Sequence, residues 1–359
     1  MIKKHFFLIL ALMCVVTQGL YSKDDDKPSV TPTAPKEYFT LWNDCEALRT
    51  LKMYVEDVTN PNSSNFIREE DRIATFDMDG TFIGELYPTY FEYNLLEYRA
   101  LDDPTYKDKA PDDVRQAAQD IRDFVRNGKK LPDHFDMIHA YAAAKAYAGM
   151  TLKEFDTYVK TYAATPANGF KGMTYAESFY KPMLEVFDYL KDNGFTYYIV
   201  SGSDRFICRS LVESLGIEPN RVIGMDVCLS SNKQGDNVGV GYTMGTDEYL
   251  VRTDSLIIKN LNTNKVRQIS QEIGKQPVLS FGNSSGDCAM HNYCMSHPKY
   301  RTATFMLVAD DDARDHADLA EGARREAKWR EAGYTVISMK NDFKTIYGYS
   351  VEKADFTFK

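Results

Sequence analysis

The spacing of apolar residues changes along the chain, and each change predicts a different kind of element. Between residues 38 and 60 the apolar positions have helical spacing, which predicts a leading amphipathic helix. The apolar run at 72–77 is typical of a buried strand. Almost the whole of 88–180 has helical spacing again, in "EYNLLEYRAL", "APDDVRQAAQDIRDFVRNG", "FDMIHAYAAAKAYAG" and "TLKEFDTYVKTYAA".

Two of these helices carry signals for their ends. Asn127 and Gly128 are expected to close the second, because glycine accepts the left-handed backbone of a helix C-terminus. Thr151 with Glu154 predicts a capping box at the start of the fourth.

After residue 180 short apolar strands alternate with amphipathic helices. The strands are expected in "FTYYIVSGS", "RVIGMDVCL", "PVLSFGNSSGD", "TATFMLVAD" and "YTVISM". Helices of about 10–15 residues between strands favour a parallel sheet covered on both faces. We therefore predict an α/β fold, a doubly wound parallel sheet, with an inserted all-helical cap domain. The core is expected at 38–88 and 181–359, and the cap at 89–180.

The N-terminus has the pattern of an export signal. Lys3 and Lys4 precede the apolar "HFFLILALMCVVTQGL", which predicts a signal peptide over 1–22 and an exported, periplasmic or secreted protein. The alternative is a single uncleaved membrane anchor. Residues 23–37, rich in proline and charge, are expected to be a linker.

Composition narrows the function classes. The formal charge of −9 without a long basic run makes nucleic acid an unsuitable partner, and no membrane partner is expected once the signal is removed. The six cysteines and six histidines are scattered without zinc-ligand spacing, and the cysteines do not form a disulfide framework. The 24 tyrosines would also suit a surface interaction module, if they formed a patch outside the cap.

Carboxylates gather at predicted strand ends instead. Asp77 and Asp79 in "DMDGT" end the first strand, Ser201 and Gly202 in "VSGS" end a second, and "GNSSGD" ends a third. In an open parallel sheet, ligands bind beyond the carboxyl ends of the strands, so these residues are expected to converge. Two neighbouring carboxylates repel each other and need a compensating cation, proton or substrate.

A magnesium ion and a phosphate would satisfy this set. Asp77, Asp79, Asp287 and Asn283 offer the hard oxygen ligands that Mg²⁺ prefers. Ser201, Gly202 and Lys265 are expected to bind phosphate, with the lysine balancing charge during transfer. Asp77 is then placed as a nucleophile and Asp79 as its acid and base.

Four features of this chain resemble, in order, the four motifs of the haloacid dehalogenase-like hydrolase superfamily: they are "DMDGT", "VSGS", Lys265 and "GNSSGD". The resemblance covers 72–88 and about 181–340, and it implies a phosphatase in which Asp77 is the nucleophile, Asp79 the acid/base and Asp287 a metal ligand. The family's fourth motif usually begins with Gly-Asp, and here Asn283 replaces that acid, which predicts weaker metal binding. Lys259 is the alternative for the third-motif lysine.

The expected substrate is a small phosphomonoester. Glu85, Tyr87 and Tyr90 combine aromatic faces with a carboxylate, a composition that recognises ammonium groups. The export signal and helical cap are also similar to those of bacterial exported phosphorylcholine phosphatases, so phosphocholine or phosphoethanolamine is favoured. The alternatives are a broad-specificity acid phosphatase, a phosphoserine phosphatase-like enzyme, and a non-catalytic protein that binds phosphorylated ligands. Equally, the aromatic residues here could simply form the core of the cap.

Overall fold

The computed structural model describes residues 36–358. The predicted signal peptide and nearly all of the predicted linker lie outside this range. None of the helices in residues 36–358 has the length and hydrophobicity needed to cross a lipid bilayer. From Tyr38 onward the chain forms one compact unit, so the division into core and cap stays a prediction.

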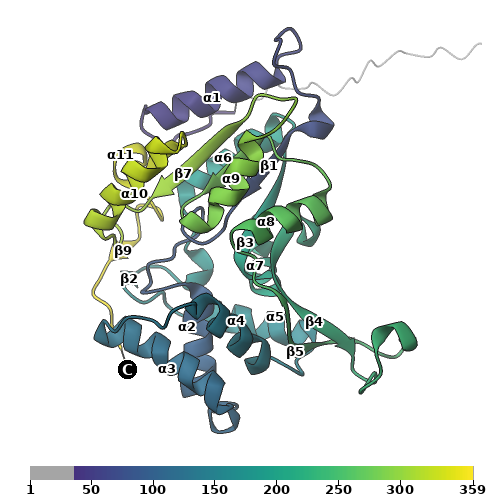
Figure 1. Cartoon of the computed structure of the whole chain (residues 1–359). Helices are drawn as coiled ribbons and strands as arrows, with labels where there is room; N and C mark the ends of the chain where they lie inside the picture. Colours follow the sequence, from purple (N-terminus) through teal and green to yellow (C-terminus); the bar gives the residue numbers. More distant parts are fainter. Residues whose placement is uncertain (1–35, 359) are drawn as a thin grey trace, which may run out of the picture. The chain divides into compact units, whose positions relative to one another are not determined.

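The structure is built from a large sheet and surrounding helices (Figure 1). The strands are β1 (Ile73–Phe76), β2 (Phe170–Lys171), β3 (Thr196–Asp204), β4 (Val222–Ser231), β5 (Leu250–Ile258), β6 (Leu279–Gly282), β7 (Ala303–Val308), β8 (Thr335–Ser338) and β9 (Glu352–Lys353). The helices are α1 (Glu46–Thr59), α2 (Phe91–Glu97), α3 (Asp112–Asn127), α4 (Phe135–Ala146), α5 (Leu152–Ala163), α6 (Lys181–Asp192), α7 (Arg205–Val212), α8 (Thr263–Gln268), α9 (Cys288–Met295), α10 (Leu319–Glu331) and α11 (Met339–Asp342).

The seven-stranded sheet has the order β5-β4-β3-β1-β6-β7-β8 and is parallel except for β5, which pairs antiparallel with β4. The predicted doubly wound parallel sheet is therefore confirmed, with one antiparallel edge that was not predicted. β1 lies at the centre, between β3 and β6, and all four of its residues are buried. The strand that carries "DMDGT" is thus the most enclosed part of the sheet.

An aromatic ladder holds the central strands together. Phe76 of β1, Phe281 of β6 and Phe305 of β7 are in register, and their rings stack in sequence at 4.3 and 4.9 Å between centroids. Stacked aromatic pairs on neighbouring strands stabilise a sheet beyond their area burial. The ladder fixes β1 against β6, and this register places the loops that follow both strands at the same edge.

The helices α2 to α5 are inserted between β1 and β3, as predicted, but the inserted segment is not all-helical, because the short strand β2 lies within it and pairs with β9. α3 ends at Gly128, which has a left-handed backbone (φ 64°), and the capping box of Thr151 with Glu154 opens α5. Figure 1 shows these helices together at the end of the sheet where β4 and β5 extend. The leading helix was predicted to start at residue 38, but α1 begins at Glu46 because Trp42 instead packs edge-on against Phe343.

The inserted helices are bound to the outer strand β5. Arg252 of β5 exchanges backbone hydrogen bonds with the loop after α4: its carbonyl accepts from Gly149 N–H at 2.8 Å, and its N–H donates to the Met150 carbonyl at 2.9 Å. Its guanidinium lies 4.0 Å from the ring centre of Phe155 in α5 and donates to Asp204 of β3 at 2.6 Å. One buried arginine therefore joins the inserted helices to the sheet.

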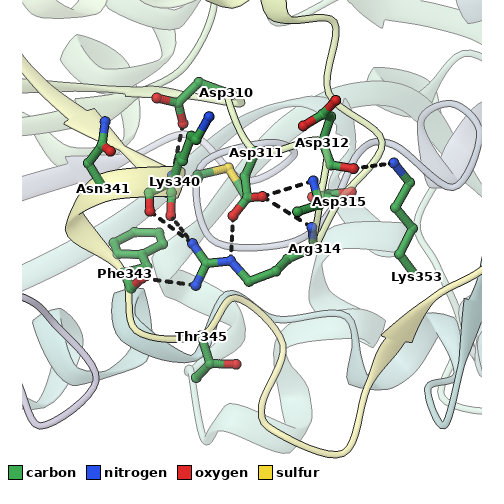
Figure 2. Close-up of polar contacts among 12 residues, drawn as sticks. Asp310, Asp311, Asp312, Arg314, Asp315, Lys340, Asn341, Phe343, Thr345 and Lys353 are labelled. Atoms are coloured by element: carbon green, nitrogen blue, oxygen red, sulfur yellow. Dashed lines mark hydrogen bonds and ion pairs between the residues drawn. The ribbon is translucent and has the colours of Figure 1, made fainter.

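The acidic run that opens 310–333 has a structural role. Figure 2 shows Arg314 paired with Asp311 and donating to three backbone carbonyls near α11: Met339 at 2.8 Å, Lys340 at 3.1 Å and Phe343 at 2.9 Å. Carbonyls at a helix end lack partners within the helix. Arg314 supplies hydrogen-bond donors to these carbonyls and so holds the C-terminal segment on the core.

A buried histidine gives the fold a measurable pH dependence. His291 of α9 donates through Nε2 to the Phe305 carbonyl at 3.1 Å, and its Nδ1 accepts from Ser280 Oγ at 2.8 Å. Burial lowers the pKa of His291 from 6.5 to about 4. Between these values the unfolded chain takes up a proton that the folded chain does not, so this group's contribution to stability is lost as the pH falls.

We therefore expect the difference in unfolding free energy between wild type and H291Q to shrink by roughly 2–3 kcal/mol as the pH falls from 7 to 4.5. Urea unfolding of both proteins across this range measures it. A difference that does not vary with pH would contradict the assignment.

Candidate active site

The carboxyl ends of β1, β3 and β6 meet at a cavity of about 350 Å³. Asp77 and Asp79 reach it from the end of β1, Gly202 and Ser203 from β3, and Asn283 and Asp287 from the loop after β6. Lys265 enters from α8. The structure thus brings together most of the residues that the motifs singled out.

Lys265 lies between two carboxylates at the base of the cavity. Its Nζ is 2.5 Å from Asp77 Oδ1 and 2.6 Å from Asp287 Oδ1, and its side chain is 1% exposed. Asp287 Oδ2 also accepts from the backbone N–H groups of Asn283 and Ser284 at 3.1 and 3.0 Å. One ammonium therefore compensates two buried negative charges, which would otherwise be costly to desolvate.

The surroundings of the two aspartates shift their pKa values in opposite directions. Burial and the adjacent Asp287 raise the pKa of Asp77, against the lowering effect of Lys265. Burial also opposes ionisation of Asp287, but Lys265 and the backbone N–H groups outweigh it, so the pKa of Asp287 lies below its usual range. Asp287 is thus the fixed anion of the pair, and Asp77 is the carboxylate that a second cation would hold ionised.

Asp79 is a carboxyl group suited to exchange protons near neutral pH. Burial raises its pKa to about 7, against the hydrogen bond that Ser203 Oγ donates to its Oδ2 at 2.7 Å. Its other oxygen, Oδ1, is buried without a hydrogen-bond partner. A general acid works best when its pKa lies near the working pH.

Of the two residues of β3 that are predicted to bind phosphate, Gly202 lines the cavity and Ser201 does not. Ser201 is fully buried behind the cavity wall, where its Oγ accepts from the Ser203 N–H at 3.1 Å. Ser203, two residues on, lines the cavity. It follows Ser201 at the strand's period of two, which is the signal that could have identified it.

Asn283 and Glu85 form a pair beside the turn of the first motif. Asn283 Nδ2 donates to Glu85 Oε2 at 3.2 Å, and burial raises the pKa of Glu85 to about 7. A side chain on Gly80 would collide with both, since a Cβ there would lie 2.0 Å from Asn283 Nδ2 and 2.6 Å from Glu85 Oε2. Gly80 also has a left-handed backbone (φ 74°), so this turn requires glycine for two reasons, the lack of space and the backbone conformation.

Two of the three predicted substrate contacts are corrected. Tyr87 is fully buried, with its ring against Tyr175, and Glu85 contacts Asn283; neither lines the cavity. Tyr90 does line it, together with Tyr93, at 5.3 Å between ring centres. The tyrosines before α2 divide between cap packing and the cavity because the turn at 87–90 points them in different directions.

A buried ion pair beside the cavity was not predicted. Lys259 Nζ donates to Glu92 Oε1 at 2.8 Å, both side chains being 5% exposed, and Glu92 Oε2 accepts from the Asp204 N–H at 3.1 Å. His139 of α4 packs beside Glu92, and burial lowers the pKa of His139 to about 4. Lys259, the alternative third-motif lysine, thus binds the inserted helix α2, whereas Lys265 contacts Asp77.

The mouth of the cavity is basic. Arg324, Arg325 and Lys328 of α10 line it, and Glu321 pairs with both arginines. No local pattern in the sequence indicates that this helix lines the cavity. Its place over the site depends on the packing of α10 beside β7 and β8.

The donors present suit Mg²⁺ more than a transition metal. No cluster of three or more His, Cys, Asp or Glu side chains arranged to hold a metal occurs in the part of the chain that the structure describes. The oxygens available are the carboxylates of Asp77 and Asp287 and the amide oxygen of Asn283, which is buried without a partner. Mg²⁺ is bound through one or two carboxylates, water and substrate phosphate, so this set fits it.

The arrangement defines a class of fold. The central strand ends in "DMDGT", its two neighbours carry "VSGS" and "GNSSGD", and a lysine comes from the helix before the second of these. This arrangement resembles the core of the haloacid dehalogenase-like hydrolases.

Comparison with solved structures agrees at the level of fold. A conserved protein of unknown function from Anaerococcus prevotii matches at 15% identity and a TM-score of 0.50, over 90% of this chain and 100% of that one. A phosphoserine phosphohydrolase-like protein from Francisella tularensis matches at 14% identity and a TM-score of 0.39, over 74% and 94%. A HAD family hydrolase from Salmonella enterica serovar Typhi matches at 15% and 0.40, over 76% and 69%. No protein-family model and no curated protein matches the chain.

The base of the cavity yields a stability prediction. Lys265→Met leaves Asp77 and Asp287 buried without their cation, so in the presence of chelator at neutral pH the free energy of unfolding should fall by roughly 3–5 kcal/mol. Lys233→Met, which breaks an exposed pair with Asp247, is the control, with an expected loss of about 0–1 kcal/mol. Urea unfolding of both variants measures the difference, and equal losses would contradict the role assigned to Lys265.

Proposed function

We propose that the protein is a phosphomonoester hydrolase that works through an aspartyl-phosphate on Asp77. The observation that carries the proposal is the placement, at one cavity, of a carboxylate held by Lys265 and a second carboxyl group, Asp79, whose pKa is raised to about 7. A nucleophile beside a proton donor is the requirement for displacing an alcohol from phosphorus.

The reaction has two displacements. In the first, an Asp77 oxygen forms a bond to phosphorus as the bond from phosphorus to the leaving oxygen breaks, and Asp79 gives its proton to the departing alcohol. In the second, Asp79 takes a proton from water as the water oxygen attacks phosphorus, which releases inorganic phosphate and restores the Asp77 carboxylate. Ser203 orients Asp79 through its hydrogen bond, and Lys265 balances the charge on the phosphoryl oxygens.

Asp77, Asp79, Asp287 and Asn283 are the residues that would hold Mg²⁺. When bound, the ion would neutralise phosphate charge and keep Asp77 ionised. The buried, unpartnered oxygen Asn283 Oδ1 supports this assignment, since buried polar atoms are normally paired.

For the substrate we favour phosphocholine or phosphoethanolamine. Tyr90 and Tyr93 line the cavity with Asp136, which gives aromatic rings and a carboxylate for an ammonium group. The basic residues of α10 at the mouth would instead favour a leaving group with its own negative charge, as in phosphoserine. Because the cavity offers both, a broad specificity for small phosphomonoesters is the second candidate. The export signal in residues 1–22 would give the enzyme extracellular or periplasmic substrates.

The first test is hydrolysis of phosphocholine, phosphoethanolamine, phosphoserine and p-nitrophenyl phosphate with Mg²⁺ and with chelator. We expect turnover by the wild type with Mg²⁺, none with chelator, and none by D77N, because an amide is not a nucleophile here. The rank order of substrates separates the cationic from the anionic leaving group. Phosphate binding without turnover would overturn the hydrolase and leave a non-catalytic binding protein.

Loss of the proton donor should lower the rate by different amounts for different leaving groups. D79N keeps the shape of the side chain but cannot supply a proton, so kcat should fall about 10²–10⁴-fold. D120N, on the outer face of α3, is the matched control and should retain wild-type kcat. A p-nitrophenolate leaving group needs little protonation, so its first displacement should suffer less than that of phosphocholine in single-turnover measurements. An equal loss for both substrates would contradict the role of Asp79 as acid.

A further inference from the structure

The amide of Asn283 is held in one orientation by the carboxylate of Glu85. Nδ2 donates to Glu85 Oε2 at 3.2 Å, and Asn283 is only 4% exposed. The two side chains meet across the bare Cα of Gly80, where any Cβ would collide with them. This contact therefore depends on the glycine of the first motif.

The orientation decides which atom of Asn283 faces the cavity. The hydrogen bond from Nδ2 to Glu85 Oε2, with the carboxyl oxygen as acceptor, turns the NH₂ end of the amide toward Glu85. The oxygen then points the other way, and Oδ1 is buried without any hydrogen-bond partner in the described chain. A buried amide oxygen without a partner beside Asp77 is placed as a cation ligand.

We propose that Glu85 is a positioning residue, which fixes the amide of Asn283 so that its oxygen and not its NH₂ group faces the metal site. The inference rests on the magnesium site of the proposed function and adds a residue to it. Without Glu85 the amide could turn, and a hydrogen-bond donor would then face the cation.

The need for such a partner follows from the asparagine. A carboxylate presents an oxygen at either end, so an aspartate at 283 would serve as a ligand in both orientations. An amide has one oxygen and needs an acceptor to fix it. Glu85 should therefore matter for metal affinity when residue 283 is asparagine and not when it is aspartate. This coupling distinguishes positioning from the plain electrostatic attraction of a nearby negative charge.

The experiment is a double-mutant cycle on Mg²⁺ affinity, measured by isothermal titration calorimetry with the metal alone. The proteins are wild type, E85L, N283D and E85L/N283D, and the melting temperature of each reports whether it is folded. We expect E85L to weaken Mg²⁺ binding about 10–100-fold, the range for lost support of a metal ligand. In the N283D background E85L should cost less than about threefold, since a cycle isolates the pair.

If E85L does not fold, E85Q replaces it in both backgrounds. Glutamine can turn its own amide and so no longer fixes which end of Asn283 faces it, and it can donate to the carboxylate of N283D. E85Q should therefore weaken Mg²⁺ binding with asparagine at 283 and leave it unchanged in the N283D background.

Four results separate the possible failures. Equal losses in both backgrounds would mean that Glu85 acts through its charge or its packing, which overturns the inference. No loss in either background would overturn it as well. Failure of the wild type to bind Mg²⁺ would remove the metal site of the proposed function itself. Mg²⁺ binding without hydrolysis of any phosphomonoester would refute the hydrolase and leave the inference standing.

Discussion

The compensation of buried negative charge at the carboxyl edge of the sheet is the constraint on which the site depends. Asp77, Asp79 and Asp287 are all at least 93% buried, and all come from the ends of adjacent central strands. Lys265 neutralises one of the three charges, and a raised pKa allows Asp79 to carry a proton. Asp77 and Asp287 share the one ammonium of Lys265, a condition that attracts a further cation and, through it, a phosphate.

The parallel sheet was predictable because its strands are buried on both faces and therefore appear as short apolar runs between amphipathic helices. β5 was missed for the opposite reason. It is an edge strand whose residues are exposed or partly exposed except for Arg252, a residue that sequence reasoning assigns to the surface. Its burial depends on Asp204 and Phe155, which are distant in the sequence.

The site was predictable to the extent that it lies on strand ends. Asp77, Asp79, Asn283 and Asp287 follow apolar runs, so their convergence follows from the geometry of a parallel sheet. The choice of Lys265 needed only its place in the helix before β6. The partnership of Lys259 with Glu92 and the basic mouth formed by α10 have no local signal, because each arises from elements that meet only in the folded chain. Tyr87 was assigned wrongly for a related reason: a run of tyrosines does not tell which rings turn inward.

The attachment of the inserted helices to β5 bears on how a substrate reaches Asp77. A cap that swings away from its core needs flexible links, yet here two backbone hydrogen bonds at Arg252 and the buried ion pair of Lys259 with Glu92 cross between the two parts. A wide opening would have to break all of them and strand a charge in the interior. The inserted helices are therefore expected to stay in place while a substrate enters and leaves, so that the size of a substrate is limited by the dimensions of the cavity and not by the range of a hinge motion.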